Sequence, residues 1–428
     1  MLGIVFILFF VLIFLGVPLA ACTALPSILP YVADNTFTGN YQFVLRAVVS
    51  ALDSTSLIAI PLFMLSGSIM ARGGISRRLF DVFAYFIGEV TAGIPCAVVV
   101  TCLFYGAISG SGPATVAAVG AMCIPILTKL GYDKIFSTAL VATAGGLGVI
   151  IPPSIPFIVY GVACGVSVGD LFIAGIVPGI LVAFVLMLYA YLYCKRRGED
   201  KEKIRANHQE LKKKGCLRVL KEGFWALLTP VIILGGIYSG IVTPTEAACV
   251  SIFYAIFVCL AFYKSMKLKE LPAFLAGAVK SYAPMCLLLG FGGAFGKILH
   301  LLHAPEIISD YLTSTIDSKI LFLLLINVVF LFLGMVGETT SGIIIMGPVI
   351  LTAAQSFGVS PIHFGVILII NLAIGLVSPP IGVNLFVAAP LVGESPMRIA
   401  KAAVPFMLFF LAALLIVTFV PQLSLLFL

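Results

Sequence analysis

The chain contains 428 residues, of which 61% are apolar and only 10% are charged, and its mean hydropathy is +1.19. Soluble globular proteins are about half apolar and about a quarter charged, so this composition indicates an integral membrane protein and excludes a soluble enzyme. The net charge of +7 does not indicate nucleic-acid binding, because residues 194–222 hold eleven Lys or Arg against five Asp or Glu and so carry +6 of it.

Apolar segments along the whole chain predict helical spans, since one span takes about 20 apolar residues. Continuous apolar segments occupy 3–21, 44–70, 133–165, 172–193, 224–242, 246–263, 281–301, 361–390 and 402–420. The first of these lacks the basic residues of a signal peptide, so we interpret it as a retained span. In total, about ten to fourteen membrane-embedded helices fit the length.

Two further apolar segments, 91–128 and 318–357, are interrupted at their centres by polar and glycine-rich residues. The first interruption is Ser109-Gly-Ser-Gly-Pro113, and the second is Gly337-Glu-Thr-Thr-Ser-Gly342. Each arm is short for a full crossing, which favours a re-entrant helical hairpin with its polar tip near mid-membrane. Such non-helical backbone is tolerated only where it lines a cavity or is buried in protein.

Basic residues orient these segments, because cytosolic loops of membrane proteins are enriched in Lys and Arg. Nine full crossings place the basic residues of 72–78, 129–134, 195–222, 264–269 and 398–401 on one side, which we take as cytosolic. This arrangement predicts a cytosolic N-terminus and a periplasmic C-terminus, with the first hairpin entering from the cytosol and the second from outside. Contact of the basic loop with anionic lipids is a secondary interpretation.

An internal repeat is the strongest structural signal in the sequence. With an ungapped shift of 227 residues, Gly110, Gly120, Gly131 and Gly148 fall on Gly337, Gly347, Gly358 and Gly375, and Pro152-Pro153 fall on Pro379-Pro380. Both units share one plan of a hairpin, a short loop and an interrupted helix. Together with the opposite entry sides, this predicts an inverted-topology repeat, which is typical of secondary transporters.

The interrupted helices supply the chemistry that we expect. Proline removes a hydrogen-bond donor and disfavours the helical conformation of its predecessor, while upstream glycines let the backbone turn. The break leaves unpaired carbonyl groups, which suit a hard cation such as Na⁺, and a helix N-terminus, which suits a carboxylate.

We therefore predict one Na⁺ site at each hairpin tip and a substrate site between them. The first ion site uses Ser109, Ser111, Thr115, Gly145, Gly148 and Ile151, and the second uses Gly337, Thr339, Thr340, Gly375 and Ser378. The predicted substrate contacts are Ser154, Asn384, Glu338, Pro153 and Pro380. The alternative interpretation is that serine and glycine here only allow close helix packing. For Glu338 the alternative is a helix cap in a water-filled vestibule.

Other features indicate structure rather than chemistry. Thr243-Pro-Thr-Glu246 precedes an apolar segment and predicts a helix N-terminal cap. The ten cysteines are scattered singly and the four histidines form no metal motif. An intramembrane protease lacks its partner residues, and an ion channel explains the paired hairpins less well than a carrier. We therefore expect a transporter that is not an enzyme and has no cofactor besides Na⁺ as coupling ion.

Four motifs resemble one known family over essentially the whole chain. They are Ile108-Ser-Gly-Ser-Gly-Pro-Ala-Thr115, Gly148-Val-Ile-Ile-Pro-Pro-Ser154, Gly240-Ile-Val-Thr-Pro-Thr-Glu-Ala247 and Gly375-Leu-Val-Ser-Pro-Pro-Ile-Gly-Val-Asn384. The sequence resembles the large membrane subunit of the tripartite ATP-independent periplasmic (TRAP) transporters, and among them the sialic acid (N-acetylneuraminate) members most.

This resemblance implies Na⁺-coupled uptake of an organic acid across the bacterial inner membrane by an elevator movement. It also implies two partners, a small membrane subunit and a periplasmic substrate-binding protein. We divide the chain accordingly into scaffold helices at 1–90, a first transport unit at 91–165, scaffold helices at 166–317 with the basic loop 195–222, a second transport unit at 318–390 and a C-terminal span at 391–428. The main rival is a stand-alone Na⁺-coupled carboxylate carrier without a binding protein.

Overall fold

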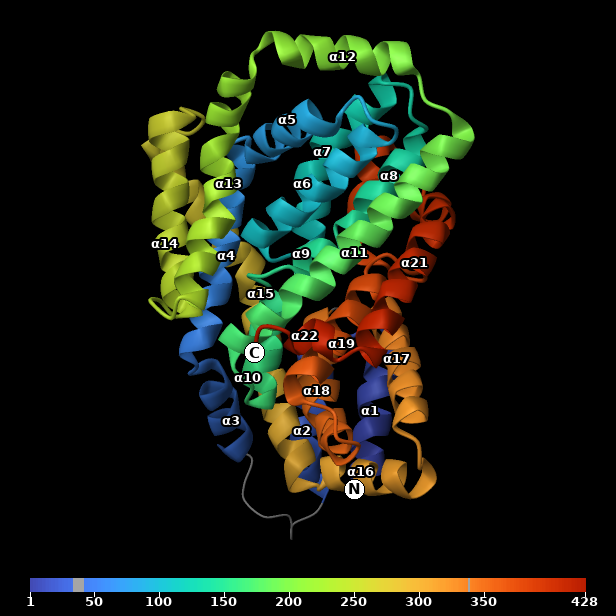
Figure 1. Cartoon of the computed structure of the whole chain (residues 1–428). Helices are drawn as coiled ribbons and strands as arrows, with labels where there is room; N and C mark the ends of the chain where they lie inside the picture. Colours follow the sequence, from blue (N-terminus) through green and yellow to red (C-terminus); the bar gives the residue numbers. More distant parts are fainter. Residues whose placement is uncertain (34–41, 338) are drawn as a thin grey trace.

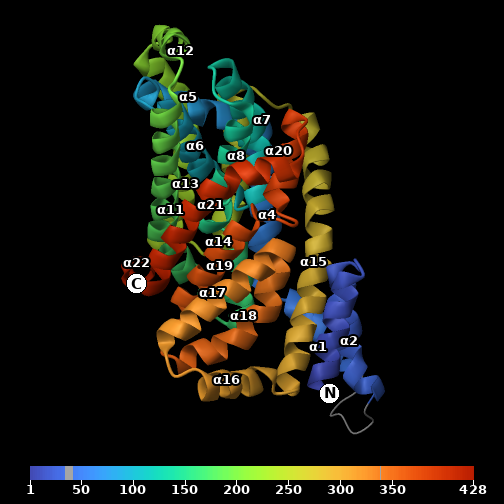
Figure 2. The same ribbon diagram turned by 90° about the vertical axis from the view of Figure 1, so that its right-hand side faces the viewer.

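The computed structural model describes residues 1–33, 42–337 and 339–428, and two perpendicular views show the arrangement of its helices (Figures 1 and 2). The described residues form helices joined by short turns, with no β-strand among them. Nine helices in this part of the chain are long and apolar enough to cross a membrane. The predicted all-α polytopic membrane fold is therefore confirmed.

The first half of the chain contains α1 (Leu2–Phe14), α2 (Leu19–Ala33), α3 (Gln42–Leu52), α4 (Thr55–Arg72), α5 (Ile75–Ile87), α6 (Gly93–Ser109), α7 (Gly112–Lys129), α8 (Lys134–Ala144), α9 (Leu147–Ile150), α10 (Ile155–Cys164) and α11 (Val168–Arg197). Helix α12 (Lys201–Lys213) connects it to the second half. That half contains α13 (Cys216–Tyr238), α14 (Pro244–Phe257, continued by a π-helical turn over Val258–Phe262), α15 (Leu271–Leu301), α16 (Ala304–Thr315), α17 (Lys319–Val336), α18 (Thr339–Ser356), α19 (Pro361–Gly375), α20 (Val383–Val392), α21 (Pro396–Phe419) and α22 (Gln422–Leu425).

The predicted internal repeat relates these two halves. Helix α7 begins at Gly112 and α18 at Thr339, while α8 begins at Lys134 and α19 at Pro361, so that both pairs are 227 residues apart. Close to the same offset, the α1–α2 hairpin pairs with α13–α14, the α3–α4 pair with α15, α5 with α16, and α11 with α21. The repeat therefore covers nearly the whole chain, which is more than the two hairpins and interrupted helices that the sequence pattern marked.

The two repeats are inverted relative to each other. The basic helix α12 lies with α5 at one end of the molecule, whereas α16 and the N-terminus lie at the other (Figures 1 and 2). We call these the α12 end and the α16 end. The α6–α7 hairpin enters from the α12 end and the α17–α18 hairpin from the α16 end (Figure 2). The predicted inverted topology with two re-entrant hairpins is thus confirmed.

The N-terminal segment differs from the predicted topology. The sequence predicts one span over 3–21, but the structure divides this segment between α1 and α2, which are joined by a turn at Gly16 with φ of 75°. At about 1.5 Å per residue, α1 is about 20 Å long and so shorter than the hydrocarbon core of about 30 Å. The α1–α2 hairpin stays in the half of the molecule nearer α16 (Figure 2). The predicted single span over 3–21 is therefore wrong, and the N-terminus lies at the end of the molecule away from α12 (Figure 1).

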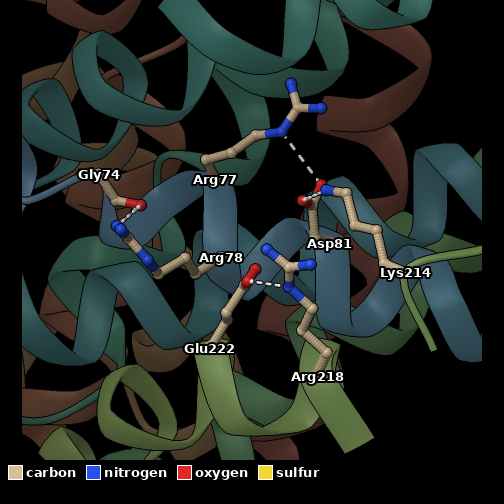
Figure 3. Close-up of polar contacts among 7 residues, drawn as sticks. All are labelled: Gly74, Arg77, Arg78, Asp81, Lys214, Arg218 and Glu222. Carbon is tan, nitrogen blue, oxygen red and sulfur yellow. Dashed lines mark hydrogen bonds and ion pairs between the residues drawn. The ribbon is translucent and has the colours of Figure 1, made fainter. Parts of the chain in front are cut away.

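Charged side chains position α5 against the α12–α13 segment at the α12 end (Figure 3). Arg77 contacts one carboxylate oxygen of Asp81 at 3.0 Å, and Lys214 contacts the other at 3.1 Å. Arg78 donates to the backbone carbonyl of the residue before α5 and lies 3.7 Å above the ring of Tyr263. Exposed ion pairs contribute at most about 1 kcal/mol each, so they orient α5 more than they stabilise it.

The predicted cap at α14 is confirmed. The backbone N–H of Thr243 donates to the Glu246 carboxylate at 2.7 Å, and the Glu246 N–H donates back to Thr243 Oγ1 at 3.3 Å. Thr245 next to them donates its hydroxyl to the carbonyl of Thr55, the first residue of α4, at 2.9 Å. This part of the motif at 240–247 therefore has a structural role, since it caps α14 and connects it to α4.

The repeats are interlocked rather than side by side. Helix α2 packs against α15, and its repeat partner α14 packs against α4. In the same way α10 packs against α18, and its counterpart α20 packs against α7. Each half-helix that follows a Pro-Pro break therefore contacts the hairpin of the other repeat, which brings both breaks and both hairpins to the centre of the molecule.

Candidate ion and substrate site

One central cavity of about 560 Å³ joins the elements that the sequence marked as functional. Its wall contains Gly110, Ser111 and Pro113 from the first hairpin, Thr339 and Thr340 from the second, and Val149, Ile155, Leu376 and Val383 beside the two breaks. The rest of the wall comes from the start of α2, Met64 of α4 and residues 281–288 of α15. We call this the hairpin-tip cavity. None of its described lining residues is charged.

The first hairpin tip concentrates oxygen atoms in a buried position. Ser109 Oγ lies 3.0 Å from Thr115 Oγ1, and Thr115 donates its hydroxyl to the Ser111 carbonyl at 2.8 Å. The exposed fractions of Ser109 and Thr115 are 4% and 0%. The three residues that the sequence grouped at this tip are therefore in contact with one another.

Glycine lets the first broken helix approach these oxygens. A Cβ atom on Gly148 would lie 2.5 Å from Thr115 Oγ1 and 2.7 Å from the Ser111 carbonyl oxygen. A Cβ on Gly145 would lie 3.3 Å from the carbonyl oxygen of Gly112. Both predicted backbone positions thus lie against the tip. The side chain of Ile151 packs against Gly179 of α11.

Asn384 reaches this tip from the second repeat. Its amide nitrogen donates to the Ala142 carbonyl of α8 at 3.0 Å, and its side chain is fully buried. Its Oδ1 atom has no hydrogen-bond partner among the described residues, and a Cβ on Gly112 would lie 3.3 Å from it. Buried carbonyl oxygens are normally paired, so this one is available to a ligand that the protein binds. The sequence placed Asn384 in the substrate site, whereas the structure places it beside the first hairpin.

Three of the other predicted substrate residues, Ser154, Pro153 and Pro380, are not part of the wall of the hairpin-tip cavity. Ser154 donates its hydroxyl to the Val149 carbonyl at 2.5 Å and caps α10 by accepting from the Phe157 N–H. Pro153 approaches the first tip through its carbonyl, which would lie 2.9 Å from a Cβ on Gly110. Pro380 lines a separate, smaller cavity near the start of α21. Glu338 lies outside the described residues.

The second tip repeats the glycine contact of the first repeat. A Cβ on Gly334 would lie 3.1 Å from the Cα of Gly375, so the arm α17 touches the backbone of α19. Thr339 and Thr340 face the hairpin-tip cavity. Gly337 continues the arm, since its N–H donates to the Leu333 carbonyl at 2.8 Å.

Ser378 lies just beyond the end of α19 and contacts α21. Its hydroxyl donates to the Ile374 carbonyl at 2.9 Å and lies 3.6 Å from the sulfur of Met407 in α21. Gly375 therefore contacts the arm of the second hairpin, whereas Ser378, three residues beyond the end of α19, bonds within its own segment and contacts α21.

Each tip is joined to its own break by one backbone hydrogen bond. In the first repeat the Ile155 N–H donates to the Gly110 carbonyl at 3.2 Å, and in the second the Ile381 N–H donates to the Met335 carbonyl at 3.3 Å. In both cases the donor follows the Pro-Pro pair directly or by one residue. These two bonds hold each hairpin tip to the break that the sequence paired with it.

Two polar clusters near the site were not predicted. Within the membrane, Asn371 of α19 donates to Asn327 Oδ1 of α17 at 2.6 Å, and Asn327 donates to Thr418 of α21 at 3.3 Å. Buried asparagines in apolar helices are costly and often join helices, and this was the available sequence signal.

The second cluster lies at the base of the first hairpin. There the Glu199 carboxylate accepts from the Ala92 N–H at 3.0 Å and from the Tyr132 hydroxyl at 2.6 Å. Burial, followed by this hydrogen bond, raises the pKa of Tyr132. Glu199 lies in the basic loop, far in sequence from both donors, so no local pattern marked it. Its contacts clamp the two arms of the hairpin to the end of α11.

Comparison with known families agrees with this geometry. The family described as "Tripartite ATP-independent periplasmic transporter, DctM component" matches residues 6–423. The isethionate TRAP transporter permease protein DctMQ of Oleidesulfovibrio alaskensis is 40% identical over 96% of this chain, and the chain spans 64% of that protein's length. The C4-dicarboxylate TRAP transporter large permease protein DctM of Pseudomonas aeruginosa is 39% identical over 86% of this chain and 85% of that protein.

More distant similarities link the chain to a further relative by sequence and to a solved structure. The sialic acid TRAP transporter large permease protein SiaM of Vibrio cholerae is 33% identical over 97% of this chain and 95% of that protein. Among solved structures, the YdaH transporter of Alcanivorax borkumensis matches with a TM-score of 0.64, covering 97% of this chain and 98% of that chain at 16% sequence identity. At that identity the likeness supports the fold alone.

Proposed function

Because the chain belongs to the DctM component family of the tripartite ATP-independent periplasmic transporters, we propose that it is the large membrane subunit of a Na⁺-coupled uptake system for a small organic anion. The observation that carries this proposal is the hairpin-tip cavity, in which both tips and both helix breaks meet. The basic residues enriched in α12 support an orientation with the α12 end in the cytosol and the α16 end in the periplasm of a bacterial inner membrane.

The first hairpin tip is the stronger of two proposed ion sites. Ser109, Thr115 and the Ser111 carbonyl supply converging oxygens, and the unpaired Oδ1 of Asn384 supplies another from the second repeat. Oxygen atoms of this kind bind hard cations such as Na⁺. We therefore move Asn384 from the substrate site to the first ion site. An ion there would link the two repeats, because its ligands come from both.

The second proposed ion site lies between Thr339, Thr340 and the backbone near Gly337 and Gly375. It is supported by the close approach of α17 and α19 and by the repeat relation to the first site. Because no described residue lining the hairpin-tip cavity is charged, the ions have a second proposed role. Burying an anion without a compensating charge is costly, so bound Na⁺ would make binding of the anion favourable and couple the two.

The substrate class follows from the relatives and the cavity together. The relatives are named for isethionate, C4-dicarboxylates and sialic acid, all of which carry an acidic group. A cavity of about 560 Å³ lies within the usual range for small-molecule sites. Sialic acid, which the sequence motifs favoured, is retained as one of three substrates to be tested.

Transport would follow from movement of the hairpins and broken helices against the other helices. In this elevator scheme, 91–165 and 318–390 move as transport units while α2, α4 and α15 form the scaffold wall of the hairpin-tip cavity. The small membrane subunit would enlarge the scaffold, and a periplasmic binding protein would deliver the substrate at the α16 end.

Uptake into vesicles tests this proposal directly. The chain is reconstituted with its small membrane subunit, and uptake of isethionate, succinate and N-acetylneuraminate is measured with and without the binding protein and a Na⁺ gradient. We expect uptake of one of these anions only when both the binding protein and Na⁺ are present. Uptake without Na⁺ would contradict the coupling, and uptake without the binding protein would identify a stand-alone carrier.

A further inference from the structure

A second cavity of about 270 Å³ follows the hairpin-tip cavity along α15. Residues 281–288 of α15 line the hairpin-tip cavity, and residues 289–300 line this second one. Its other walls come from 50–57 on α3 and α4, from 159–163 on α10 and from Ile344 and Pro348 on α18. It therefore lies between the proposed scaffold and both transport units, closer to the α16 end than the hairpin-tip cavity is.

Two basic side chains enter this second cavity from α15. Lys297 and His300 are one helical turn apart, and both are exposed. Lys297 Nζ donates to the Ser50 hydroxyl at 3.0 Å. In the described part of the chain no acidic group forms an ion pair with Lys297, and none lines the cavity. Asp53 is near in sequence but does not belong to the wall.

The inverted repeat shows that these charges are not a requirement of the fold. The offset of 227 residues that aligns the hairpins places Lys297 opposite Met70 and His300 opposite Gly73. Met70 is fully buried in the core, and Gly73 lies directly against Cys259 of the helix that follows α14. The two equivalent positions near the α12 end are therefore packed against other residues rather than open to a cavity, and the Gly73 carbonyl there accepts from Arg78 at 2.6 Å.

Glycines keep this second cavity open. Gly293 and Gly296 face it from the same helix as the two basic residues, and nothing lies within 4 Å of a Cβ placed on Gly296. A charged side chain beside a cavity with low-dielectric walls attracts ions of opposite charge more strongly than an exposed surface lysine does. The open cavity and the Lys297 ammonium group, which has no acidic partner among the described residues, indicate a ligand with a negative charge.

We propose that the Lys297–His300 cavity binds the acidic group of the transported organic anion on the periplasmic side, before the anion reaches the hairpin-tip cavity. This inference rests on the proposed function, since it takes the substrate to be an organic anion that enters at the α16 end. Lys297 supplies the charge and Ser50 orients its ammonium group. His300 lines the path one turn closer to the α16 end.

A cysteine placed in the wall tests binding without removing Lys297. Ser54 lines the cavity, so the Ser54→Cys chain, in complex with the small membrane subunit, is placed in phosphatidylcholine vesicles and treated with a thiosulfonate reagent. We expect isethionate, succinate or N-acetylneuraminate to slow its modification, measured above the background of the native cysteines. His303→Cys is the matched control, because His303 is exposed at the same end but does not line the cavity. Its modification rate should not change.

The role of the charge is tested in the same background. In Ser54→Cys/Lys297→Gln the protection should disappear, and in Ser54→Cys/Lys297→Arg it should remain. Uptake at subsaturating substrate should fall about tenfold in Lys297→Gln, with the Na⁺ dependence unchanged and with partial recovery in Lys297→Arg. Uptake also provides the readout if the cysteine variant does not fold.

Three outcomes would overturn the inference. Protection by none of the three anions would exclude the binding site, and protection that appears only when phosphatidylglycerol is added would assign the site to a lipid headgroup. Loss of the small subunit from the Lys297→Gln complex would show that Lys297 belongs to a subunit interface. In each case Na⁺-dependent uptake by the unmodified chain would still stand, so failure of this inference is separate from failure of the proposed function.

Discussion

The two hairpins share one arrangement of helices, but the contacts described in each are of different kinds. In the first, hydroxyl and carbonyl oxygens of Ser109, Ser111 and Thr115 contact one another at the tip. In the second, the arms are joined to their neighbours by glycine contacts and by the buried pair Asn327 and Asn371. The inverted repeat thus preserves helix lengths and close backbone contacts. The buried polar groups described in the two copies lie at different positions, at the tip in the first and between the helices in the second. Symmetry predicts where a site lies but not which atoms form it.

The largest expected effect concerns the close approach in the second repeat. Gly375→Ala would push a Cβ into the backbone of Gly334, which cannot move without displacing the arm α17. We expect uptake to be lost and the melting temperature of the purified complex to fall, because overpacking costs about 1–3 kcal/mol or more. Gly277→Ala on α15, where a Cβ meets nothing within 4 Å, is the matched control and should leave both unchanged.

The same substitution in the first repeat sharpens the comparison. Gly148→Ala meets the Thr115 hydroxyl and the Ser111 carbonyl rather than two stretches of packed helix backbone. It should reduce Na⁺-dependent uptake with a smaller loss of thermal stability than Gly375→Ala. Equal losses of stability in both variants would show that the first approach is also purely a packing contact.

A smaller effect is expected when one oxygen is removed from the first tip. Thr115→Val keeps the shape of the side chain but removes Oγ1, so the Na⁺ concentration for half-maximal uptake should rise about tenfold, since a polar contact to a charged group contributes about 1.5 kcal/mol. Uptake titrated against Na⁺ measures this. The control is Thr101→Val in the same hairpin, whose hydroxyl bonds only to the Ala97 carbonyl at 2.6 Å. A similar rise in both variants would contradict the ion site.

The smallest effect concerns the base of the first hairpin. Tyr132→Phe removes the hydrogen bond to the Glu199 carboxylate and should destabilise the complex by about 1–2 kcal/mol. Thermal unfolding of Tyr132→Phe, Glu199→Gln and the double variant gives the coupling energy of the pair. Tyr191→Phe, an exposed tyrosine on α11, provides the baseline. Strictly additive single effects would mean that Glu199 does not clamp this hairpin.

Much of the fold could be predicted because the membrane imposes strong rules on sequence. Hydrophobic segments, Pro-Pro breaks and spaced glycines identify spans, interrupted helices and the repeat without any tertiary information. The error at residues 3–21 has a physical reason. A continuous apolar segment does not distinguish one span from a short hairpin when a single Gly16 makes the turn.

The candidate site was predicted in part, and the residues show why. Ser109, Thr115 and Gly148 lie close together because their spacing within one repeat already fixes them on a hairpin and its adjoining helix. The contact of Asn384 with α8 was not predicted, because its position depends on how α20 of one repeat crosses the hairpin of the other. Ser378 follows Gly375 closely in sequence, but the chain has left the helix there and its hydroxyl contacts Met407 of α21.

The sequence by itself determined that the protein lies in a membrane, that it is helical, and that it contains two hairpins with their breaks and an inverted repeat. These features could be read because hydropathy, proline and glycine act locally on the chain. Only the tertiary structure decided which oxygens meet, since contacts such as Asn384 with the first hairpin and Glu199 with Tyr132 join residues 242 and 67 positions apart. It also placed Lys297 and His300 beside a cavity at one end only. Whether a charge is paired or left facing a cavity depends on the packing of distant helices, which no local pattern records.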